Sequence, residues 1–523
     1  MSVSRRSFLL GLPAAAALVS CSPVASARST IDVRDYGAKG NGTADDSKAI
    51  IAAVAALGPG SILYFPGGQY RFAKLHPPGG GAIAITGISD VEVEFEPDAE
   101  LVMDNVQSAT GIGTGHGIVI RGPASNISLR NVAVRWAHPS TRSVGDGIRI
   151  VGYPTGTGTP PGWSGAATPV SGITLTDCKI RSCPQAGVIM MGVSDIDVTG
   201  LRVQESRGDG LHFNACRQAR IDDYTATDTG DDGLALVTYY SADSAFDSAA
   251  DTFSFPRLTE WSNTDFTVTN VTVQGGRANG VRLAGANRVA IASLSVTEAQ
   301  SGAGVIVDSA STGSDTAWSY VASRGIQMKA IALRDCETGI HILARPDESR
   351  DRRFADFDVE VSDATMRNCT NWGVRAESLT DLRMTGLQLD TCSVDASSTS
   401  GGRGGVGLGD ADDVRLGSVT IRHENPVVVF QTHNSAGFFV GELQVAITDP
   451  NGSIDPKPCV NLDESRGVFD AITVKWDAAP DFWHPIRVTN HGVGCGVQSG
   501  TSPVTVRALD VDPASVSNPI TRC

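Results

Sequence analysis

The chain has 523 residues, a formal net charge of −15, 58 glycines and only 6% aromatic residues. The negative charge argues against a nucleic-acid or anionic-membrane partner, because no basic stripe is present to neutralise phosphates. It also weakens the case for a polyanionic substrate. Short apolar runs separated by Gly, Asn, Asp, Ser and Thr indicate an all-β protein.

The first 27 residues are typical of an export signal. Residues 4–9 (SRRSFL), followed by the apolar run 10–19, resemble a bacterial twin-arginine signal. Residues 18–21 (LVSC) resemble a lipobox, in which Cys21 would be acylated, and the alternative is cleavage after Ala27. The apolar run is too short for a permanent transmembrane helix. We therefore expect an exported protein, either a cell-surface lipoprotein or a secreted or periplasmic protein, whose membrane contact is limited to a lipid anchor at Cys21.

The segment after the signal predicts a helical cap. Residues 47–57 are a strong helix-forming run with an apolar face, opened by Asp45 or Asp46 and ended by a Gly-Pro-Gly sequence, and a strand over residues 61–65 follows. The phrase DYGAKGNG at residues 35–42 resembles the N-terminal cap of pectate-lyase-like and polygalacturonase-like right-handed β-helices. A solenoid needs such a cap because its first turn exposes core and strand edges.

From about residue 85 a short phrase repeats, consisting of a glycine, an apolar residue, any residue and another apolar residue. Gly187, Gly210 and Gly233 are 23 residues apart, a plausible length for a coil of three strands. A sandwich or a propeller would not produce this single register, so the sequence predicts an all-β, single-stranded right-handed parallel β-helix with turns of about 23 residues. The repeat glycines are Gly117, Gly147, Gly187, Gly210, Gly233, Gly280, Gly304, Gly339, Gly373 and Gly405.

We expect residues 28–523 to form one domain. We expect a cap over residues 30–80, core rungs over 85–410, and terminal rungs with a C-terminal cap over 410–523, because no linker or change of composition marks a boundary. The cysteines beyond Cys21 have no zinc-like spacing and are expected to be mostly buried apolar residues, with Cys495 and Cys523 as one possible disulfide.

The intervals from Gly147 to Gly187, from Gly233 to Gly280 and from Gly304 to Gly339 are longer than one turn, and each holds an insertion directly after the glycine-led strand. Insertions at one phase of a repeat emerge on one side of the rod, so they would stand as walls of a common cleft. Aromatic residues on these walls could stack on sugars, or could simply bury their own loops. They include Tyr153, Trp163, Tyr239, Tyr240, Phe246, Phe253, Phe255, Trp261, Trp318 and Tyr320, of which Tyr239, Tyr240 and Trp261 are our candidates for substrate binding.

Carboxylates recur at one position of the repeat. The residue before the glycine and the second residue after it should face outward, whereas the apolar residues face the core. This alternation places Asp209 and Asp232 on adjacent rungs about 4.8 Å apart, with His212 and Arg282 beside them and Asp231 at the turn. Like charges on neighbouring rungs destabilise a fold unless they are used, so we interpret the three Asp residues as catalytic.

These phrases resemble conserved motifs of glycoside hydrolase family 28, the polygalacturonases. Asp209-Gly210-Leu211 and TGDDGLAL at residues 229–236 resemble the family's NTDGI and GDDCIAI, and NGVRL at residues 279–283 resembles its NGVRIK. The resemblance implies that Asp209 and Asp232 polarise a water and that Asp231 protonates the leaving oxygen. It also implies that Arg282, with Asn279 beside it, binds sugar. Two carboxylates in different protonation states are what glycoside hydrolysis requires.

The sequence also departs from the family pattern. The family's GHG motif is missing between Asp232 and Arg282, and Gly115-His116-Gly117 lies several rungs upstream. The family's Lys two residues after the Arg is Ala284. His212 could replace the missing His as a modulator of a carboxyl pKa or as a sugar ligand, or it could be an ordinary packed His. These absences put polygalacturonate in doubt as the substrate.

We expect an exported inverting glycoside hydrolase that acts on a polysaccharide other than plain polygalacturonate, although rung spacing alone does not reject retention. One alternative is a polysaccharide lyase or epimerase, for which Arg149 or Arg282 would be the base. Another is a carbohydrate-binding surface solenoid without catalysis. Arg149 is also a candidate substrate ligand. We expect a monomer with no metal or other cofactor and no nucleic-acid partner.

Overall fold

The structure of the protein, a computed structural model, describes residues 28–152, 168–238, 246–247, 252–253, 263–299, 301–311, 319–345, 350–396, 404–453, 455–489 and 504–522. Several residues singled out from the sequence lie outside this part. They are the export signal with Cys21, and Tyr153, Trp163, Tyr239, Tyr240, Phe255, Trp261, Trp318, Cys495, Cys523 and the side chains of Phe246 and Phe253. The predictions made for them therefore remain predictions.

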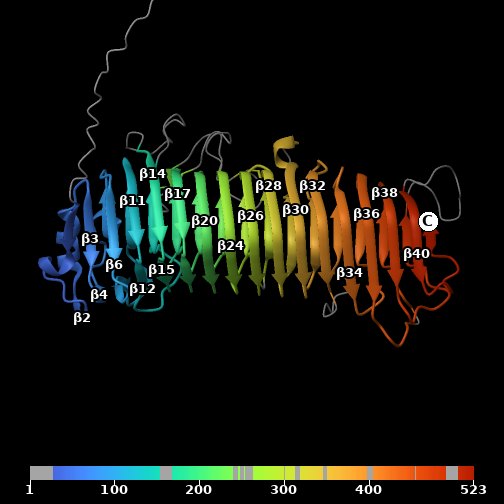
Figure 1. Ribbon diagram of the computed structural model, residues 1–523, viewed down its shortest axis with the longest axis horizontal. Helices are drawn as coiled ribbons and strands as arrows, with labels where there is room; N and C mark the ends of the chain where they lie inside the picture. Colours follow the sequence, from blue (N-terminus) through green and yellow to red (C-terminus); the bar gives the residue numbers. More distant parts are fainter. Residues whose placement is uncertain are drawn as a thin grey trace, which may run out of the picture.

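The chain winds into a long rod in which strands from successive turns lie side by side (Figure 1). Two long parallel sheets form it, one of 15 strands and one of 22. This arrangement confirms the predicted parallel β-helix. The 15-stranded sheet contains β5 (Gly81–Thr86), β10 (His116–Arg121), β13 (Ile148–Val151), β16 (Val188–Met191), β19 (Leu211–Asn214), β21 (Leu234–Val237), β25 (Val281–Ala284), β27 (Ala303–Ser309), β29 (Thr338–Ala344), β31 (Trp372–Ser378), β33 (Val406–Gly409), β35 (Phe430–His433), β37 (Val460–Asp463), β39 (Ile486–Thr489) and β41 (Ile520–Arg522).

The 22-stranded sheet contains β1 (Ser29–Asp32), β2 (Asn41–Asp45), β3 (Ser61–Phe65), β4 (Gly68–Phe72), β6 (Val91–Phe95), β7 (Ala99–Met103), β11 (Ala124–Arg130), β12 (Ala133–Trp136), β14 (Val170–Thr176), β15 (Lys179–Arg181), β17 (Val193–Thr199), β18 (Arg202–Gln204), β20 (Arg217–Thr227), β24 (Thr264–Gln274), β26 (Asn287–Thr297), β28 (Arg324–Arg334), β30 (Asp356–Arg367), β32 (Thr385–Asp395), β34 (Arg415–His423), β36 (Ala436–Ile447), β38 (Arg466–Lys475) and β40 (Val504–Asp512). Two short antiparallel pairs complete the strands, β8 (Val106–Gln107) with β9 (Ile112–Gly113) and β22 (Phe246–Asp247) with β23 (Thr252–Phe253).

The glycine-led strands stack in the register expected from the repeat. Leu211 of β19 pairs with Val188 of β16 on one side and with Leu234 of β21 on the other. Leu211 and Phe213 are fully buried in one continuous hydrophobic core that runs along the rod. Each turn thus covers the apolar side chains of its neighbour, which is how a solenoid is stabilised.

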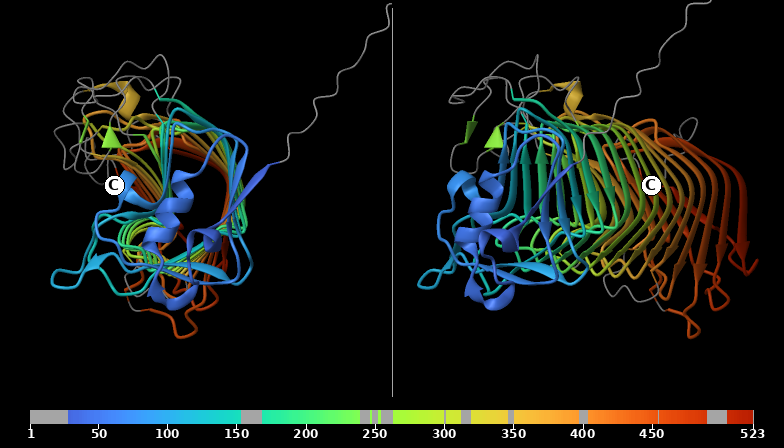
Figure 2. Two further views of the ribbon diagram at one scale, coloured as in Figure 1. Left: turned by 90° about the vertical axis from the view of Figure 1, so that its left-hand side faces the viewer. Right: turned by 60° about the vertical axis from the view of Figure 1, so that its left-hand side comes forward.

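The 22-stranded sheet bends within its long strands. Asp223, Asn270, Ser293 and Ala330 have φ between 52° and 59°, and the pairing of β20 with β24 skips Asp223 and Asn270. A left-handed residue turns the chain through a corner, and Asp and Asn tolerate this conformation well. The sheet therefore supplies two faces of the coil, and the 15-stranded sheet supplies the third (Figure 2).

A helix covers the N-terminal end of the rod (Figure 2). Helix α1 (Ser47–Ala55) packs against β5 and buries Ile50 and Ala53. Asp45 accepts a hydrogen bond from the Ser47 backbone N–H at 3.0 Å. Short 3-10 helices occur at η1 (Val33–Tyr36), η2 (Pro78–Gly80) and η3 (Arg352–Phe354). Across the described ranges, none of these helices has the length and apolar character needed to span a bilayer.

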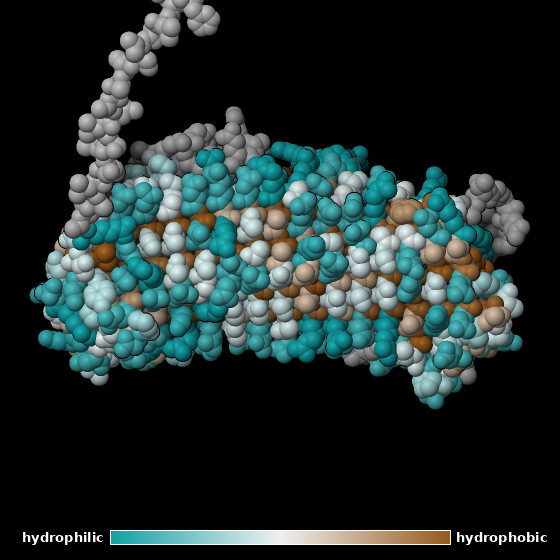
Figure 3. All heavy atoms as spheres, viewed as in Figure 1, coloured by the Kyte–Doolittle hydropathy of each residue, from teal (hydrophilic) through white to brown (hydrophobic). Residues whose placement is uncertain are grey.

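The coil continues with the same two sheets through β41. On the face seen in Figure 3, apolar residues form interrupted strips between hydrophilic residues, which dominate both long edges of the rod. Seven described cysteines are buried and free, as expected for small apolar residues, and they are Cys178, Cys183, Cys216, Cys336, Cys369, Cys392 and Cys459.

Candidate active site

The structure brings together the three Asp residues predicted to be catalytic. Asp209 and Asp232 immediately precede the glycines that lead into β19 and β21, and these two strands are neighbours. The backbone N–H of Asp232 donates a hydrogen bond to Oδ1 of Asp209 at 3.1 Å. One carboxylate oxygen from each of Asp209, Asp231 and Asp232 lies within 4.8 Å of the others.

A glycine between the carboxylates and the strand makes this stacking possible. A Cβ on Gly210 would lie 2.3 Å from the hydroxyl oxygen of Tyr224 and 2.5 Å from the carbonyl oxygen of Gly233. Tyr224 is fully buried and its hydroxyl donates to that carbonyl oxygen at 2.7 Å. Only a residue without a side chain leaves room for this bond, so the glycine fixes the distance between the rungs of Asp209 and Asp232.

Asp209 is held in its ionised form by His212. Oδ2 of Asp209 lies 2.8 Å from Nδ1 of His212, which belongs to β19 and is only 4% exposed. Burial alone would raise the pKa of Asp209, but the hydrogen bond and charge of His212, with the charges of Arg142 and Arg282, bring that pKa below its ordinary value. His212 therefore acts on the Asp209 carboxylate, as one of the alternatives from the sequence expected.

The pKa of Asp232 is shifted in the opposite direction. It is 3% exposed, and burial together with the charge of Asp209 raises its pKa to about 7, although the charge of Arg282 opposes this. Asn279 donates to its Oδ1 from the backbone N–H at 3.1 Å and from Nδ2 at 2.8 Å. Asn279, predicted as a substrate ligand, thus supports the Asp232 carboxyl group. The two neighbouring carboxyl groups differ in protonation at neutral pH.

Asp231 is the most exposed member of the trio. Its side chain is 33% exposed and its Oδ2 lies 2.8 Å from Nη1 of Arg142, which comes from the irregular segment between β12 and β13. Arg142 was not predictable from the sequence, because this segment has no repeat register from which its position could be inferred. The ion pair places a guanidinium at the opening of the site.

Arg282 lies beside Asp232, as predicted, but it is bound to another carboxylate. Its Nε and Nη2 donate to the two oxygens of the fully buried Asp308 at 3.1 and 2.8 Å. Its Nη2 also lies 3.2 Å from the hydroxyl of Tyr320, whose ring centroid is 5.2 Å from the guanidinium carbon. Arg345 donates to Asp308 as well, at 2.9 Å. The remaining Nη1 of Arg282 is 4.0 Å from Oδ2 of Asp232.

Ala284, which stands where family 28 has a Lys, makes room for the groups that bind Arg282. Ala284 is fully buried and packs in a small apolar cluster with Tyr320, and strand pairing places Asp308 directly opposite Ala284 on the next rung. Tyr320 and Asp308 thus bind Arg282 from the side of position 284. The repeat register could have revealed Asp308, because it follows Gly304 at the same interval at which Ala284 follows Gly280.

The structure does not bring Arg149 into this cluster. Its Nη1 lies 2.8 Å from Oδ2 of the buried Asp146, which also contacts His116. These residues belong to β10, β13 and the turn before β13, and β16 separates that rung from β19. Burial alone would raise the pKa of Asp146, but His116 and Arg149 bring it to about 2.

The GHG rung of the family is absent from its expected place. Strand β21 pairs directly with β25. On the rung after Asp232, the residue before the repeat glycine is therefore Asn279, and no rung with the family's His lies between them. His116 lies three rungs before Asp209, as the sequence indicated. Within the described residues, one oxygen from each of the three carboxylates also has the spacing of ligands for a hard cation.

Comparison with known proteins gives one family match. Residues 30–76 match the family model described as rhamnogalacturonase A/epimerase, pectate lyase-like. The first turns of the rod are thus similar to those of pectate-lyase-like proteins. The matched part contains α1 and the first strands, in agreement with the resemblance seen in the cap phrase. No curated protein matches the chain.

Several solved structures are similar to this chain. The mannuronan C-5 epimerase A-module of Azotobacter vinelandii is 15% identical with a TM-score of 0.43, over 92% of this chain and 99% of that one. A family 87 α-1,3-glucanase of Streptomyces thermodiastaticus is 14% identical with a TM-score of 0.40, over 87% and 71%. The family 28 exopolygalacturonase of Yersinia enterocolitica is 13% identical with a TM-score of 0.35, over 93% and 78%. At these identities, function has to be argued from the site residues.

Proposed function

We propose that this protein hydrolyses glycosidic bonds of a polysaccharide by inverting general acid and base catalysis. The observation that carries the proposal is the pair Asp209 and Asp232, adjacent carboxyl groups with a lowered and a raised pKa. Opposed pKa values of this kind identify a base and an acid in one site. Glycoside hydrolysis needs both.

In this mechanism Asp232 donates its proton to the glycosidic oxygen as the bond from that oxygen to the anomeric carbon breaks. Asp209, ionised, accepts a proton from the water whose oxygen attacks the anomeric carbon. Hydroxide is thus added to one fragment and a proton to the other, and no unsaturated product forms. Asp231, paired with Arg142 at the opening, contacts the sugar nearest to the bond that breaks.

This assignment differs from the roles that the family resemblance implies, in which Asp231 is the acid. Asp232 has the raised pKa, whereas Asp231 is partly exposed and lies in an ion pair. Single Asn variants distinguish the two roles. Asp232→Asn should remove the loss of activity at high pH together with most of the rate, and Asp231→Asn should weaken substrate binding while the pH dependence remains.

We also propose that the substrate is not plain polygalacturonate and that the protein is exported. The first point is supported by Ala284 and by the missing His rung, and the second by the twin-arginine-like segment at residues 4–19. Acylation of Cys21 or cleavage after Ala27 are the two forms that export would give.

A panel of purified polysaccharides, assayed for reducing ends and for ultraviolet absorbance together, tests the proposed function. Hydrolysis predicts new reducing ends without absorbance. An absorbing product would instead indicate a lyase. Both arginines considered as a lyase base are ion-paired with buried carboxylates, Arg149 with Asp146 and Arg282 with Asp308, which favours the hydrolase. Binding without any product would indicate a carbohydrate-binding solenoid.

A further inference from the structure

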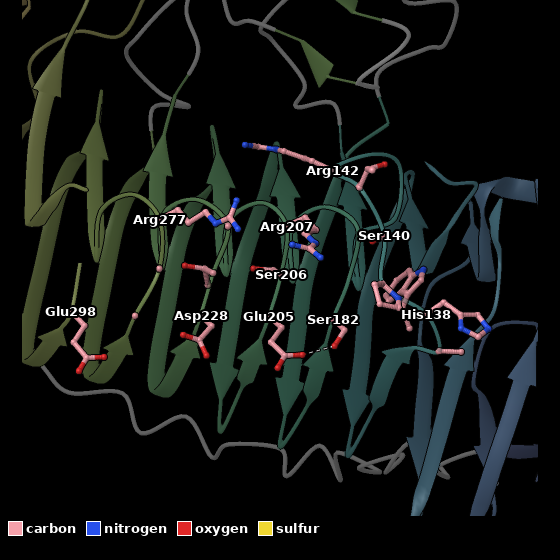
Figure 4. Close-up of a pocket in the computed structure, with 18 residues that line it drawn as sticks. His138, Ser140, Arg142, Ser182, Glu205, Ser206, Arg207, Asp228, Arg277 and Glu298 are labelled. Carbon is pink, nitrogen blue, oxygen red and sulfur yellow. Dashed lines mark hydrogen bonds between the residues drawn. The ribbon is translucent and has the colours of Figure 1, made fainter. Parts of the chain in front are cut away.

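A groove lies along a corner of the rod (Figure 4). It has a volume of about 1000 Å³, within the range of sites that bind small molecules and short oligomers. Residues 136–142 close one end, and the turns that lead into β19, β21 and β25 form its length. Arg142 lines this corner groove and is also the ion-pair partner of Asp231, so the groove adjoins the proposed active site.

Two rows of side chains face each other along the corner groove (Figure 4). One row contains the guanidinium groups of Arg142, Arg207 and Arg277. The other contains Ser182, Glu205, Asp228 and Glu298. Each row follows the rod axis, so a ligand lying along the axis would have cations on one side and anions on the other.

The repeat produces the cationic row. Arg207 and Arg277 stand two residues before Asp209 and Asn279, and Gly230 occupies the same position before Asp232. A Cβ at Gly230 would lie 2.3 Å from the carbonyl oxygen of Arg207, so no side chain fits on this rung. The two guanidiniums therefore flank the rung of Asp231 and leave a space between them.

The polar row opposite consists of residues with a left-handed backbone conformation at the ends of four strands. Ser182, Glu205, Asp228 and Glu298 follow β15, β18, β20 and β26, and each has a φ between 52° and 62°. The rungs from β15 to β26 are consecutive, so the row spans four steps of about 4.8 Å, or about 19 Å. This is long enough for several sugar residues of one chain.

The charges of the corner groove balance, and two of its cations are available to a ligand. Three arginines face three carboxylates. Arg207 and Arg277 are exposed, and neither forms an ion pair within the ranges that the structure describes. Ser182 donates to one oxygen of Glu205 at 2.7 Å, which leaves the other oxygen as an acceptor. A polyanion would be repelled by the acidic row, and a polycation by the arginines.

We propose that the corner groove binds a neutral polysaccharide chain through its hydroxyl groups. A planar guanidinium can donate two parallel hydrogen bonds to a pair of hydroxyl oxygens, and carboxylates can accept hydrogen bonds from hydroxyl groups. The balanced rows thus fit an uncharged, hydroxyl-rich chain. This inference rests on the proposed function in one respect, since it identifies the substrate class for the neighbouring Asp trio.

Affinity electrophoresis in gels that contain dextran, galactomannan, arabinoxylan or polygalacturonate tests this proposal. The protein carries Asp232→Asn so that turnover does not consume the polymer. We expect at least one neutral polymer to retard it. Arg207→Ala with Arg277→Ala should raise the dissociation constant for that polymer at least tenfold. Arg207→Lys with Arg277→Lys should also weaken binding, because an ammonium keeps the charge but lacks the planar fork.

The matched control is Arg220→Ala with Arg288→Ala, two exposed arginines on the 22-stranded sheet that pair with Asp222 and Asp265. It should bind like the parent protein. The proposal is overturned if no neutral polymer retards the protein, if polygalacturonate alone does, or if the Arg207 and Arg277 variants bind normally. Far-ultraviolet circular dichroism confirms that each variant is folded.

Turnover separates this proposal from the proposed function. Product formation from a neutral polymer with unchanged affinity in the Arg207 and Arg277 variants would refute the corner groove and leave the hydrolase in place. Binding that depends on these arginines, without any product from the protein with Asp232 intact, would support the groove and refute the hydrolase.

Discussion

At the residue scale, the opposed pKa values of Asp209 and Asp232 determine the pH range in which the site can work. Asp209 must be ionised to accept a proton, and its pKa lies below the ordinary value of 3.8. Asp232 must be protonated to donate, and its pKa is about 7. Activity should therefore be high between these values and should fall as the pH rises through about 7, because the acid loses its proton there.

This pH dependence can be measured as the initial rate of reducing-end release. Asp232→Asn should lower the rate by about 100-fold to 10,000-fold, the usual contribution of a general acid, and should abolish the decline near pH 7. Asp223→Asn is the control, because Asp223 is exposed on the other sheet and its φ of 53° suits Asn. A wild-type rate that increases through pH 7 would contradict the assignment of Asp232.

A second prediction concerns Asp308, which we interpret as a positioning residue for Arg282. Asp308→Asn removes the buried negative charge that holds the guanidinium, and Arg282 can then approach Asp232 from its present 4.0 Å. The pKa of Asp232 should fall below about 7, because a closer cation favours the carboxylate. Carboxyl ¹³C chemical shifts followed against pH report this directly.

Glu377→Gln provides the control for Asp308→Asn. Glu377 accepts hydrogen bonds from Arg375 and contacts His341, and these residues lie one or two rungs beyond Asp308 along the same sheet. Breaking the ion pairs of the fully buried Asp308 should destabilise the fold by about 3–5 kcal/mol, and breaking the partly exposed Glu377 cluster should cost less. Only Asp308→Asn should change the pKa of Asp232, and an equal change in both variants would show that Asp308 has no specific role.

At the element scale, the glycine-led strands set the distance between the rungs of Asp209 and Asp232. Gly210→Ala would place a methyl group 2.3 Å from the Tyr224 hydroxyl oxygen, so the buried Tyr or the rung must shift. We expect thermal unfolding at a lower temperature, with a loss of about 1–3 kcal/mol typical of overpacking. Gly58→Ala is the control, because no atom lies within 4 Å of its Cβ position. Equal melting temperatures for both variants would contradict this account.

The repeat made the fold and the Asp trio predictable from the sequence. The glycine-led phrase is local and recurs, so alignment of Gly187, Gly210 and Gly233 gave the strand register that the pairing confirms. The protonation states were not predictable in the same way. They depend on burial of the outward-facing His212 and Asp232, which are 4% and 3% exposed, and on Arg142, which lies outside the repeat.

At the scale of the whole molecule, one hydrophobic core runs through the described part of the rod and contains buried cysteines. Burial raises the pKa of these thiols, for example that of Cys178 to about 12 and that of Cys216 to about 12, so they should be unreactive in the native state. At least seven thiols should become reactive to a maleimide only after unfolding. Native labelling of Cys178 or Cys216, located by mass spectrometry, would contradict the continuous core.

The proposed acid and base depend most directly on the proton that Asp232 retains. Protein labelled with ¹³C at the Asp carboxyl groups can be titrated without any substrate, and Asp232→Asn assigns the resonance. We predict one Asp carboxyl that titrates near pH 7 and is absent from the variant, while the Asp209 resonance stays in its ionised position to below pH 3.8. A spectrum in which every Asp carboxyl titrates at its ordinary pKa would contradict the proposed acid and base.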